Sequence, residues 1–290
     1  MLPIIDAHLH LWDTADIVPP WLPEAPSLLR TFTLDDWLAS AGSSDGGWQL
    51  ARAIYVEIDA APEDKPRENR QILERIRKGD GPLAGAVIAA DLLARDVRGE
   101  LAPWLGDPGL KGIRHVLHTP ASPAGTCLKP DLIANIKRLG ELDLAFDACM
   151  RPGELGDLAA LAEAAPETRI ILDHCGNPGS AFLGEGPESS RLAVWCAGLS
   201  RLGDCPNVVC KLSGLDLGPN RETVRRGVDF LFDVFGEDRL IWASNYPVCE
   251  LGTPLRPWLD AVHDAVAPRG EAALMKVFAL NAARVYRIAG

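Results

Sequence analysis

Residues 239–248 read RLIWASNYPV, the last of a series of short apolar runs that decides the fold. The apolar residues 240–243 give way to Ser244 and Asn245, and an aromatic residue and a proline follow. A short apolar run bounded by turn residues is typical of a strand that is buried on both faces. The stretch therefore predicts a buried strand that ends at the carboxamide of Asn245.

Seven similar runs precede this one, and most are continuous rather than alternating in hydrophobicity, as in strands covered on both faces. They are PIIDAHLH (3–10), ARAIYVEID (51–59), LAGAVIAAD (83–91), LKGIRHVLH (110–118), LAFDACM (144–150), RIILDHCG (169–176) and NVVCKLSG (207–214). Helical patterns lie between or after the runs, at 34–42, 67–79, 130–142, 153–166, 221–236 and 271–286. Eight strand–helix units in 290 residues predict an α/β protein, a single-domain (β/α)8 barrel of the TIM type over residues 1–290.

The composition excludes several classes of protein and partner. The hydrophobic content of 47% supports a large core and excludes a disordered chain. A net charge of −11 without a basic block argues against a nucleic acid or an anionic membrane as partner. The opening MLPIIDAHLHLWD has no basic region and no long apolar stretch, so we expect no signal peptide and a cytoplasmic protein. Seven cysteines without a CxxC pair predict buried free thiols.

Polar side chains stand at the predicted strand ends, where a barrel of this kind carries its chemistry. Five of the six histidines lie in or beside these ends, and only His263 falls on a predicted surface helix. His8 and His10 are two residues apart on one strand, so they point to the same face and suit a metal ion. The other polar side chains at these ends are Glu57, Asp59, Arg114, His115, His118, Asp147, Asp173, His174, Lys211, Ser213 and Asn245.

Each of these residues also has a structural interpretation. A single buried histidine such as His174 commonly serves only as a hydrogen-bonded core group. Arg114 is costly to bury without an anion, and a substrate carboxylate and Glu57 are both candidates for that anion. Asp147 fits a structural part as well as a binding part. Four aromatic residues either line the mouth of a pocket or pack as ordinary aromatic residues: Trp12, Trp21, Trp48 and Tyr246.

The ordered set DAHLHLWD, GIR, FDACMRPGEL, ILDHCGNP, NVVCKLSGL and RLIWASNYPV resembles the amidohydrolase superfamily. Within it the set is most similar to the amidohydrolase-2 group, which includes sugar-acid lactonases and 2-pyrone-4,6-dicarboxylate hydrolase. The resemblance extends from Ile5 to Tyr286. It implies a (β/α)8 barrel with a site built on His8, His10, His174 and the end of the eighth strand.

The chain departs from this family pattern in two places. The family typically carries an aspartate on strand eight, in SDWP or SDYP, which acts as general base toward a water; here the text is SNYP. The carboxamide of Asn245 cannot accept a proton, although it can hold a water or a substrate oxygen by hydrogen bonds. The fourth strand carries GIRH where some relatives have a carbamylated lysine, so we expect one divalent metal ion, zinc, or none.

The resemblance and the residues together predict a hydrolase that opens a small lactone, that of a sugar acid, at the C-terminal mouth of the barrel. We expect a small-molecule substrate. The sequence leaves open whether the protein forms a homo-oligomer. The alternatives are a decarboxylase of an unsaturated or aromatic acid, and a binding variant impaired by a natural or engineered Asp→Asn change. The predicted roles are metal ligands for His8, His10 and His174, substrate contacts for Arg114, Asp147 and Trp12, and catalysis for His174, Asn245 and Glu57. Because Asn245 cannot accept a proton, the general base must be another residue, and the candidates are His174, Glu57 and Asp147.

Overall fold

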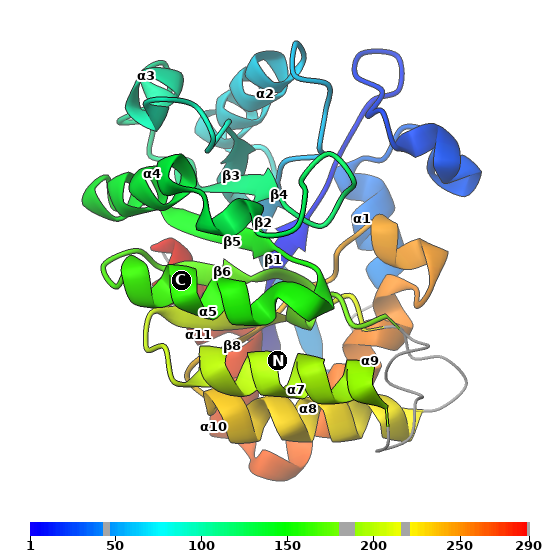
Figure 1. Ribbon diagram of the computed structural model, residues 1–290. Helices are drawn as coiled ribbons and strands as arrows, with labels where there is room; N and C mark the ends of the chain where they lie inside the picture. The colour runs from blue at the N-terminus through cyan, green and yellow to red at the C-terminus, as the bar shows by residue number, and fades with distance from the viewer. Residues whose placement is uncertain (43–46, 180–188, 216–220, 289–290) are drawn as a thin grey trace.

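The computed structural model describes residues 1–42, 47–179, 189–215 and 221–288. Its eight strands follow one another in chain order, and each pairs in parallel with the next (Figure 1). The predicted (β/α)8 barrel is therefore confirmed. The strands are β1 (Leu2–Leu9), β2 (Trp48–Val56), β3 (Leu83–Ala89), β4 (Leu110–Val116), β5 (Ala145–Cys149), β6 (Ile170–Leu172), β7 (Val208–Leu212) and β8 (Leu240–Trp242).

The opening stretch brings the last strand back to the first. His10 donates its backbone N–H to the carbonyl of Tyr246 at 2.8 Å, and Asn245 donates to the carbonyl of His8 at 3.0 Å. These bonds join β1 to the segment that follows β8, where Leu9 and Tyr246 form a parallel bridge. The residues that end the eighth strand thus also bring the sheet close to a closed cylinder.

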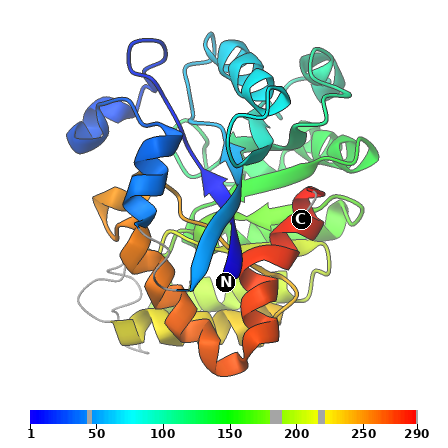
Figure 2. The ribbon, with the colours of Figure 1, turned by 180° about the vertical axis from the view of Figure 1, so that it is seen from behind.

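Helices surround the strands on the outside, as both views show (Figures 1 and 2). The C-terminal segment, which includes the π-helical turn Lys276–Leu280, packs against β1 and β8. Helices α3 (Val97–Leu101) and α7 (Ser190–Gly203) were not predicted, whereas the six predicted helical regions are present and the predicted helix around His263 is α9 (Leu255–Val266). The helices are α1 (Leu34–Ala41), α2 (Lys65–Arg77), α3 (Val97–Leu101), α4 (Pro130–Glu141), α5 (Leu155–Ala164), α7 (Ser190–Gly203), α8 (Arg221–Phe235), α9 (Leu255–Val266), α10 (Glu271–Met275) and α11 (Asn281–Tyr286). None of the described helices is long and apolar enough to cross a membrane.

Apolar residues at alternate positions of the strands form one layer of the core. Ala145, Ile171, Val209 and Ile241, from four consecutive strands, belong to a single buried cluster. Because side chains alternate between faces along a strand, the residues two positions farther on point the same way. On β5, just after β6 and on β7 those residues are Asp147, Asp173 and Lys211, so charged groups replace apolar ones toward the C-terminal ends.

Strands β6 and β8 end earlier than the sequence predicts. Each has three residues, and the chain then turns at residues with left-handed backbone angles, His174 at φ 54° and Asn245 at φ 59°. Such angles are uncommon outside glycine, and they concentrate at functional sites. Gly214 makes room for this turn, because a Cβ there would lie 2.5 Å from Cβ of His174. The glycine in NVVCKLSGL thus keeps the His174 turn free of a clash.

Candidate active site

A cavity of about 300 Å³ opens at the C-terminal ends of the strands. This is the end of the barrel at which polar residues were predicted to gather. The size suits a small-molecule ligand, at the lower limit of typical ligand pockets. The lining residues are His10, Trp21, Ile58, Asp59, Arg114, Val116, His118, Thr119, Cys149, His174, Asn177, Asn245 and Val248.

Three imidazole rings meet beside this cavity. Nε2 of His8 lies 3.0 Å from Nε2 of His10, and the ring centroids of His8 and His174 are 4.6 Å apart. Desolvation by burial lowers the pKa of His10 and of His174 to about 3. Burial and the positive charge of Lys211 also hold the pKa of His8 well below its ordinary value, so all three rings are neutral at pH 7, the protonation state that metal coordination requires.

The contacts of these rings fit a divalent metal ion. Nδ1 of His10 donates to the carbonyl of Val56 at 2.8 Å, because a carbonyl can only accept. Nδ1 of His174 lies 2.8 Å from Oγ of Ser213. Nδ1 of His8 lies 3.3 Å from Oδ1 of Asp173. Engagement of the second ring nitrogen is the usual support for a metal ligand, and in His10 the donating Nδ1 leaves the lone pair of Nε2 for an ion.

Asp173 is an additional ligand candidate that was predicted only as a partner of His174. Ligand atoms of His8, Asp173 and His174 all lie within 4.8 Å of one another. Both carboxylate oxygens of Asp173 are buried and lack a hydrogen bond within the described part of the chain, although Oδ1 lies 2.9 Å from Nζ of Lys211. A buried carboxylate with unused acceptor capacity is a further feature that fits a bound cation.

A fully buried ion-pair network contacts the ring of His8 through Lys211. Nζ of Lys211 lies 2.5 Å from Oδ2 of Asp147, 2.9 Å from Oδ1 of Asp173 and 3.1 Å from Nδ1 of His8. Burial would raise the pKa of Asp173, but Lys211 and His8 hold it well below its ordinary value. Burial raises the pKa of Asp147 to about 6 against the opposing effect of Lys211. Asp147, which was predicted as a substrate contact, is fully buried and does not line the cavity, and Tyr286 donates its hydroxyl to Oδ2 of Asp147 at 2.8 Å.

Arg114 pairs with Glu57, one of the two anions foreseen for it. Nε of Arg114 donates to Oε1 of Glu57 at 2.5 Å, and a second guanidinium nitrogen donates to the Glu57 carbonyl at 2.5 Å. The other carboxylate oxygen accepts the backbone N–H of Asp59 at 2.7 Å. Glu57 is only 1% exposed, whereas Arg114 lines the cavity. Glu57 therefore fixes the guanidinium of Arg114 and does not itself line the cavity.

A histidine–cysteine contact forms another part of the wall. Nδ1 of His118, two residues after β4, lies 3.2 Å from Sγ of Cys149, the last residue of β5. Nδ2 of Asn177 donates to the same sulfur at 3.6 Å. Cys149 was expected only as a buried free thiol and Asn177 was not predicted, whereas Trp21 was one of the aromatic residues considered for the pocket mouth. Their positions just after strand ends, or in the loop after β1, were the available signal.

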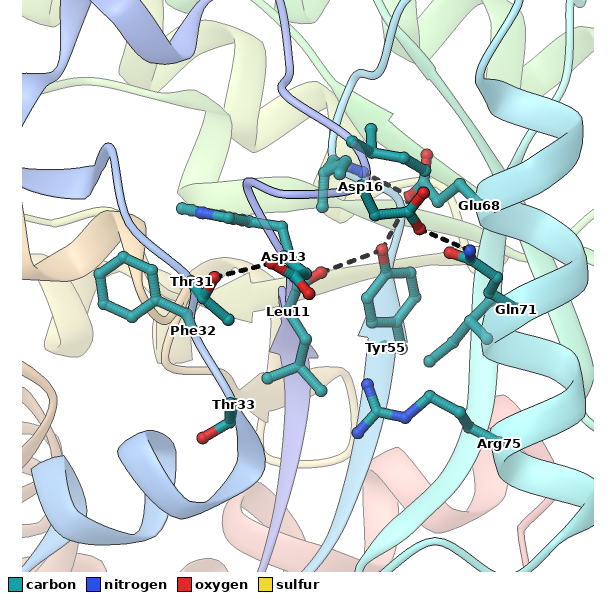
Figure 3. A pocket seen from close by; sticks show the side chains of 14 residues that line it. Leu11, Asp13, Asp16, Thr31, Phe32, Thr33, Tyr55, Glu68, Gln71 and Arg75 are labelled. Atoms are coloured by element: carbon teal, nitrogen blue, oxygen red, sulfur yellow. Dashed lines mark hydrogen bonds between the residues drawn. The ribbon is translucent and has the colours of Figure 1, made fainter.

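Trp12 lies away from this cavity. It lines a neighbouring hollow of about 220 Å³, and its indole N–H donates to the carbonyl of Arg30 at 2.7 Å. Figure 3 shows the polar contacts of that hollow, including those of Tyr55 with Glu68 and of Gln71 with Asp16. The aromatic residue that does line the main cavity is Trp21, which packs edge-on against Trp12.

Known proteins resemble this chain over nearly its whole length. A family model described as Amidohydrolase matches residues 5–288. The chain is 31% identical to an L-fucono-1,5-lactonase from Burkholderia ambifaria, over 98% of this chain and 95% of that protein. It is 23% identical to an L-rhamnono-gamma-lactonase from Scheffersomyces stipitis, over 98% of each. An amidohydrolase from Burkholderia multivorans, solved with bound zinc, matches with a TM-score of 0.83 and 27% identity, over 99% of each chain.

Proposed function

The chain belongs to the amidohydrolase family, and from this premise we propose that it hydrolyses the ester bond of a small lactone, that of a sugar acid. The observation that carries the proposal is the meeting of His8, His10 and His174 at a small cavity that also exposes Arg114. Two relatives named for sugar-acid lactonase activity align with nearly the whole chain, which supports the same class of substrate here.

His8, His10 and His174 are the residues that would hold a divalent ion, with Asp173 as a further candidate ligand. Zinc fits this set, because zinc binds imidazole nitrogen together with carboxylate oxygen. A bound ion would act as a Lewis acid toward the lactone carbonyl. The protein's own contribution is to hold the three rings in one orientation through Val56, Ser213 and Asp173.

Arg114 is placed to bind a hydroxyl-rich or anionic part of the substrate. Its guanidinium is fixed by Glu57, so little side-chain freedom is lost when a ligand binds. Asn245 lines the same cavity and can hold a water or the carbonyl oxygen by hydrogen bonds. A lactone suits a site of this kind, because its alkoxide leaving group needs less assistance than the amine of an amide.

A panel of sugar lactones tests this function directly. Purified protein is mixed with each lactone in weak buffer with a pH indicator, and we expect acid release from at least one member. The His10→Asn variant removes one of the clustered rings and should lose about 100-fold or more in rate. The His263→Ala variant, on helix α9, is the matched control and should keep the rate of the unmodified protein.

The same assay separates the alternatives. Release of CO2 from an unsaturated or aromatic carboxylic acid, with no acid release from any lactone, would contradict the lactonase proposal and favour a decarboxylase. Acid release that is the same in His10→Asn as in the unmodified protein would place the reaction outside this cavity. Metal analysis of the purified protein, run in parallel, measures the stoichiometry of zinc.

A further inference from the structure

The proposed hydrolysis requires a proton acceptor, and Asn245 is not one. Water that attacks the lactone carbonyl must lose a proton, and a carboxamide does not accept it at ordinary pH. Glu57 and Asp147, two of the predicted bases, are engaged by Arg114 and Lys211 and do not line the cavity. The third, His174, belongs to the ring cluster that fits a metal ion. Another cavity residue must therefore be considered.

Two further bases line the cavity among the described residues, Asp59 and His118. The carboxylate of Asp59 lies 3.8 Å from Nζ of Lys65, on helix α2. The side-chain contact of His118, in contrast, is made through Nδ1, which lies 3.2 Å from Sγ of Cys149, and the residue lines the cavity. His118 also stays exposed, which leaves part of its ring open to water. The position of His118 is thus the better one for a proton acceptor.

The contacts of His118 are compatible with the form that accepts a proton at Nε2. Because the amide nitrogen of Asn177 can only donate, Sγ of Cys149 serves as an acceptor in that contact. The same sulfur lies 3.2 Å from Nδ1 of His118, so an N–H at Nδ1 has an acceptor in the wall. With its hydrogen at Nδ1, the neutral ring carries its lone pair at Nε2. A base oriented by a fixed partner is the usual arrangement for general base catalysis.

Desolvation, together with nearby positive charges, favours the neutral form of His118. Desolvation of the ring and the positive charge of Arg114 lower its pKa from the ordinary value of 6.5, and Arg151 acts in the same direction. The carboxylate of Asp173 opposes them. The net lowering means that the ring is unprotonated at pH 7 and available as an acceptor.

We propose that His118 is the general base of this enzyme and replaces the acid that strand eight lacks. The inference rests on the proposed lactonase function. In the reaction, the water oxygen bonds to the lactone carbonyl carbon as one water proton moves to Nε2 of His118. The ring C–O bond then breaks, and the alkoxide takes the proton from the imidazolium. The products are the open hydroxy acid and the original neutral histidine.

The first test is His118→Ala with added imidazole. We expect kcat to fall by about 100-fold or more, in line with the loss of a general base. Free imidazole should restore part of the rate in His118→Ala and none in the unmodified protein. A folding defect cannot produce such rescue, and circular dichroism checks the fold. His115→Asn is the matched control, because His115 lies on β4 three residues before His118, does not line the cavity and accepts from Leu92 through Nδ1.

The second test asks whether an acid at residue 245 can replace His118 as the proton acceptor. In an Asn245→Asp background a carboxylate stands near the site, so His118→Ala should then cost only about tenfold or less. An equal loss in both backgrounds, or a loss in Asp59→Asn with none in His118→Ala, would overturn the assignment. If the unmodified protein opens no lactone, the proposed function fails; if it opens one and His118→Ala is as fast, only the base assignment fails.

Discussion

At residue 245 the backbone and the side chain have separate tasks. The backbone N–H donates to the carbonyl of His8 and so helps to join the last strand to the first. Its left-handed conformation is one that asparagine and aspartate both tolerate better than most residues. An acid and an amide can therefore exchange here without a cost to the backbone. The asparagine in place of the family's aspartate therefore changes the chemistry of the cavity and leaves the fold unchanged.

Glu57 offers a residue-scale prediction about stability. In Glu57→Gln the buried guanidinium of Arg114 loses its counter-charge, and a carboxamide N–H can face the N–H of Asp59. Removal of one partner of a buried ion pair costs about 3–5 kcal/mol, so we expect a loss of that size in the free energy of unfolding. Urea denaturation measures it.

The matched control for this change is Glu74→Gln. Glu74 makes an exposed ion pair with Lys78 on helix α2, and such pairs contribute about 0–1 kcal/mol. A Glu57→Gln variant that unfolds at the same urea concentration as Glu74→Gln would mean that Glu57 is not needed to fix Arg114.

At the scale of the element, helix α2 shows that hydrophobic periodicity does not identify buried polar residues. Its apolar face, with Ile72 and Leu73, was readable from the sequence and is buried as expected. Glu68 and Asn69 lie on the same helix and are buried too, at 3% exposure each. Asn69 bonds to both backbone groups of Ala89, and Glu68 accepts from Ile58. Their partners belong to β3 and to the segment after β2, so the local pattern could not identify them.

Glu68 gives this element a distinctive pH dependence. Burial raises its pKa from 4.5 to about 8, so the folded carboxyl stays protonated where the unfolded one is ionised. Between these values the folded state binds more protons than the unfolded state, and stability therefore falls as pH rises from about 4.5 to about 8. One such group contributes at most about 1.4 kcal/mol per pH unit.

The Glu68→Gln variant should remove this contribution. Glutamine keeps a carbonyl oxygen to accept from Tyr55 and Ile58, but it does not titrate. We expect its unfolding free energy to decline less between pH 5 and pH 8 than that of the unmodified protein, in urea denaturation at each pH. Parallel declines in the two proteins would show that Glu68 is ionised in the folded state.

At the scale of the whole molecule, the sequence was sufficient for the architecture and insufficient for its closure. Eight apolar runs with helices between them predict the barrel, because each run records local burial on both faces. They also place His8, His10 and His174 at one end. Closure depends instead on contacts between distant segments. Asp6 accepts from Ser244, 238 residues farther along the chain.

Asp6 links three elements at the point where the barrel closes. Oδ1 accepts the backbone N–H groups of His8, at 3.1 Å, and of Ser244, at 2.9 Å. Oδ2 accepts the indole N–H of Trp37 on helix α1 at 3.0 Å and the Ser244 hydroxyl at 2.5 Å. A fully buried carboxylate with four donors satisfies each of them without a hydrogen of its own. A carboxamide would present an N–H to at least one donor.

We therefore expect Asp6→Asn to lower the free energy of unfolding by about 2–4 kcal/mol, because buried donors lose their acceptor. Asp131→Asn, in the exposed first turn of helix α4, should change it by no more than about 0.5 kcal/mol. Hydrogen exchange adds a positional test, since the amides of His10 and Asn245 bridge β1 and the segment after β8. In Asp6→Asn these two amides should exchange faster relative to the amides of the β4–β5 pair. Unchanged exchange at both, with stability matching Asp131→Asn, would mean that the backbone bonds close the barrel without Asp6.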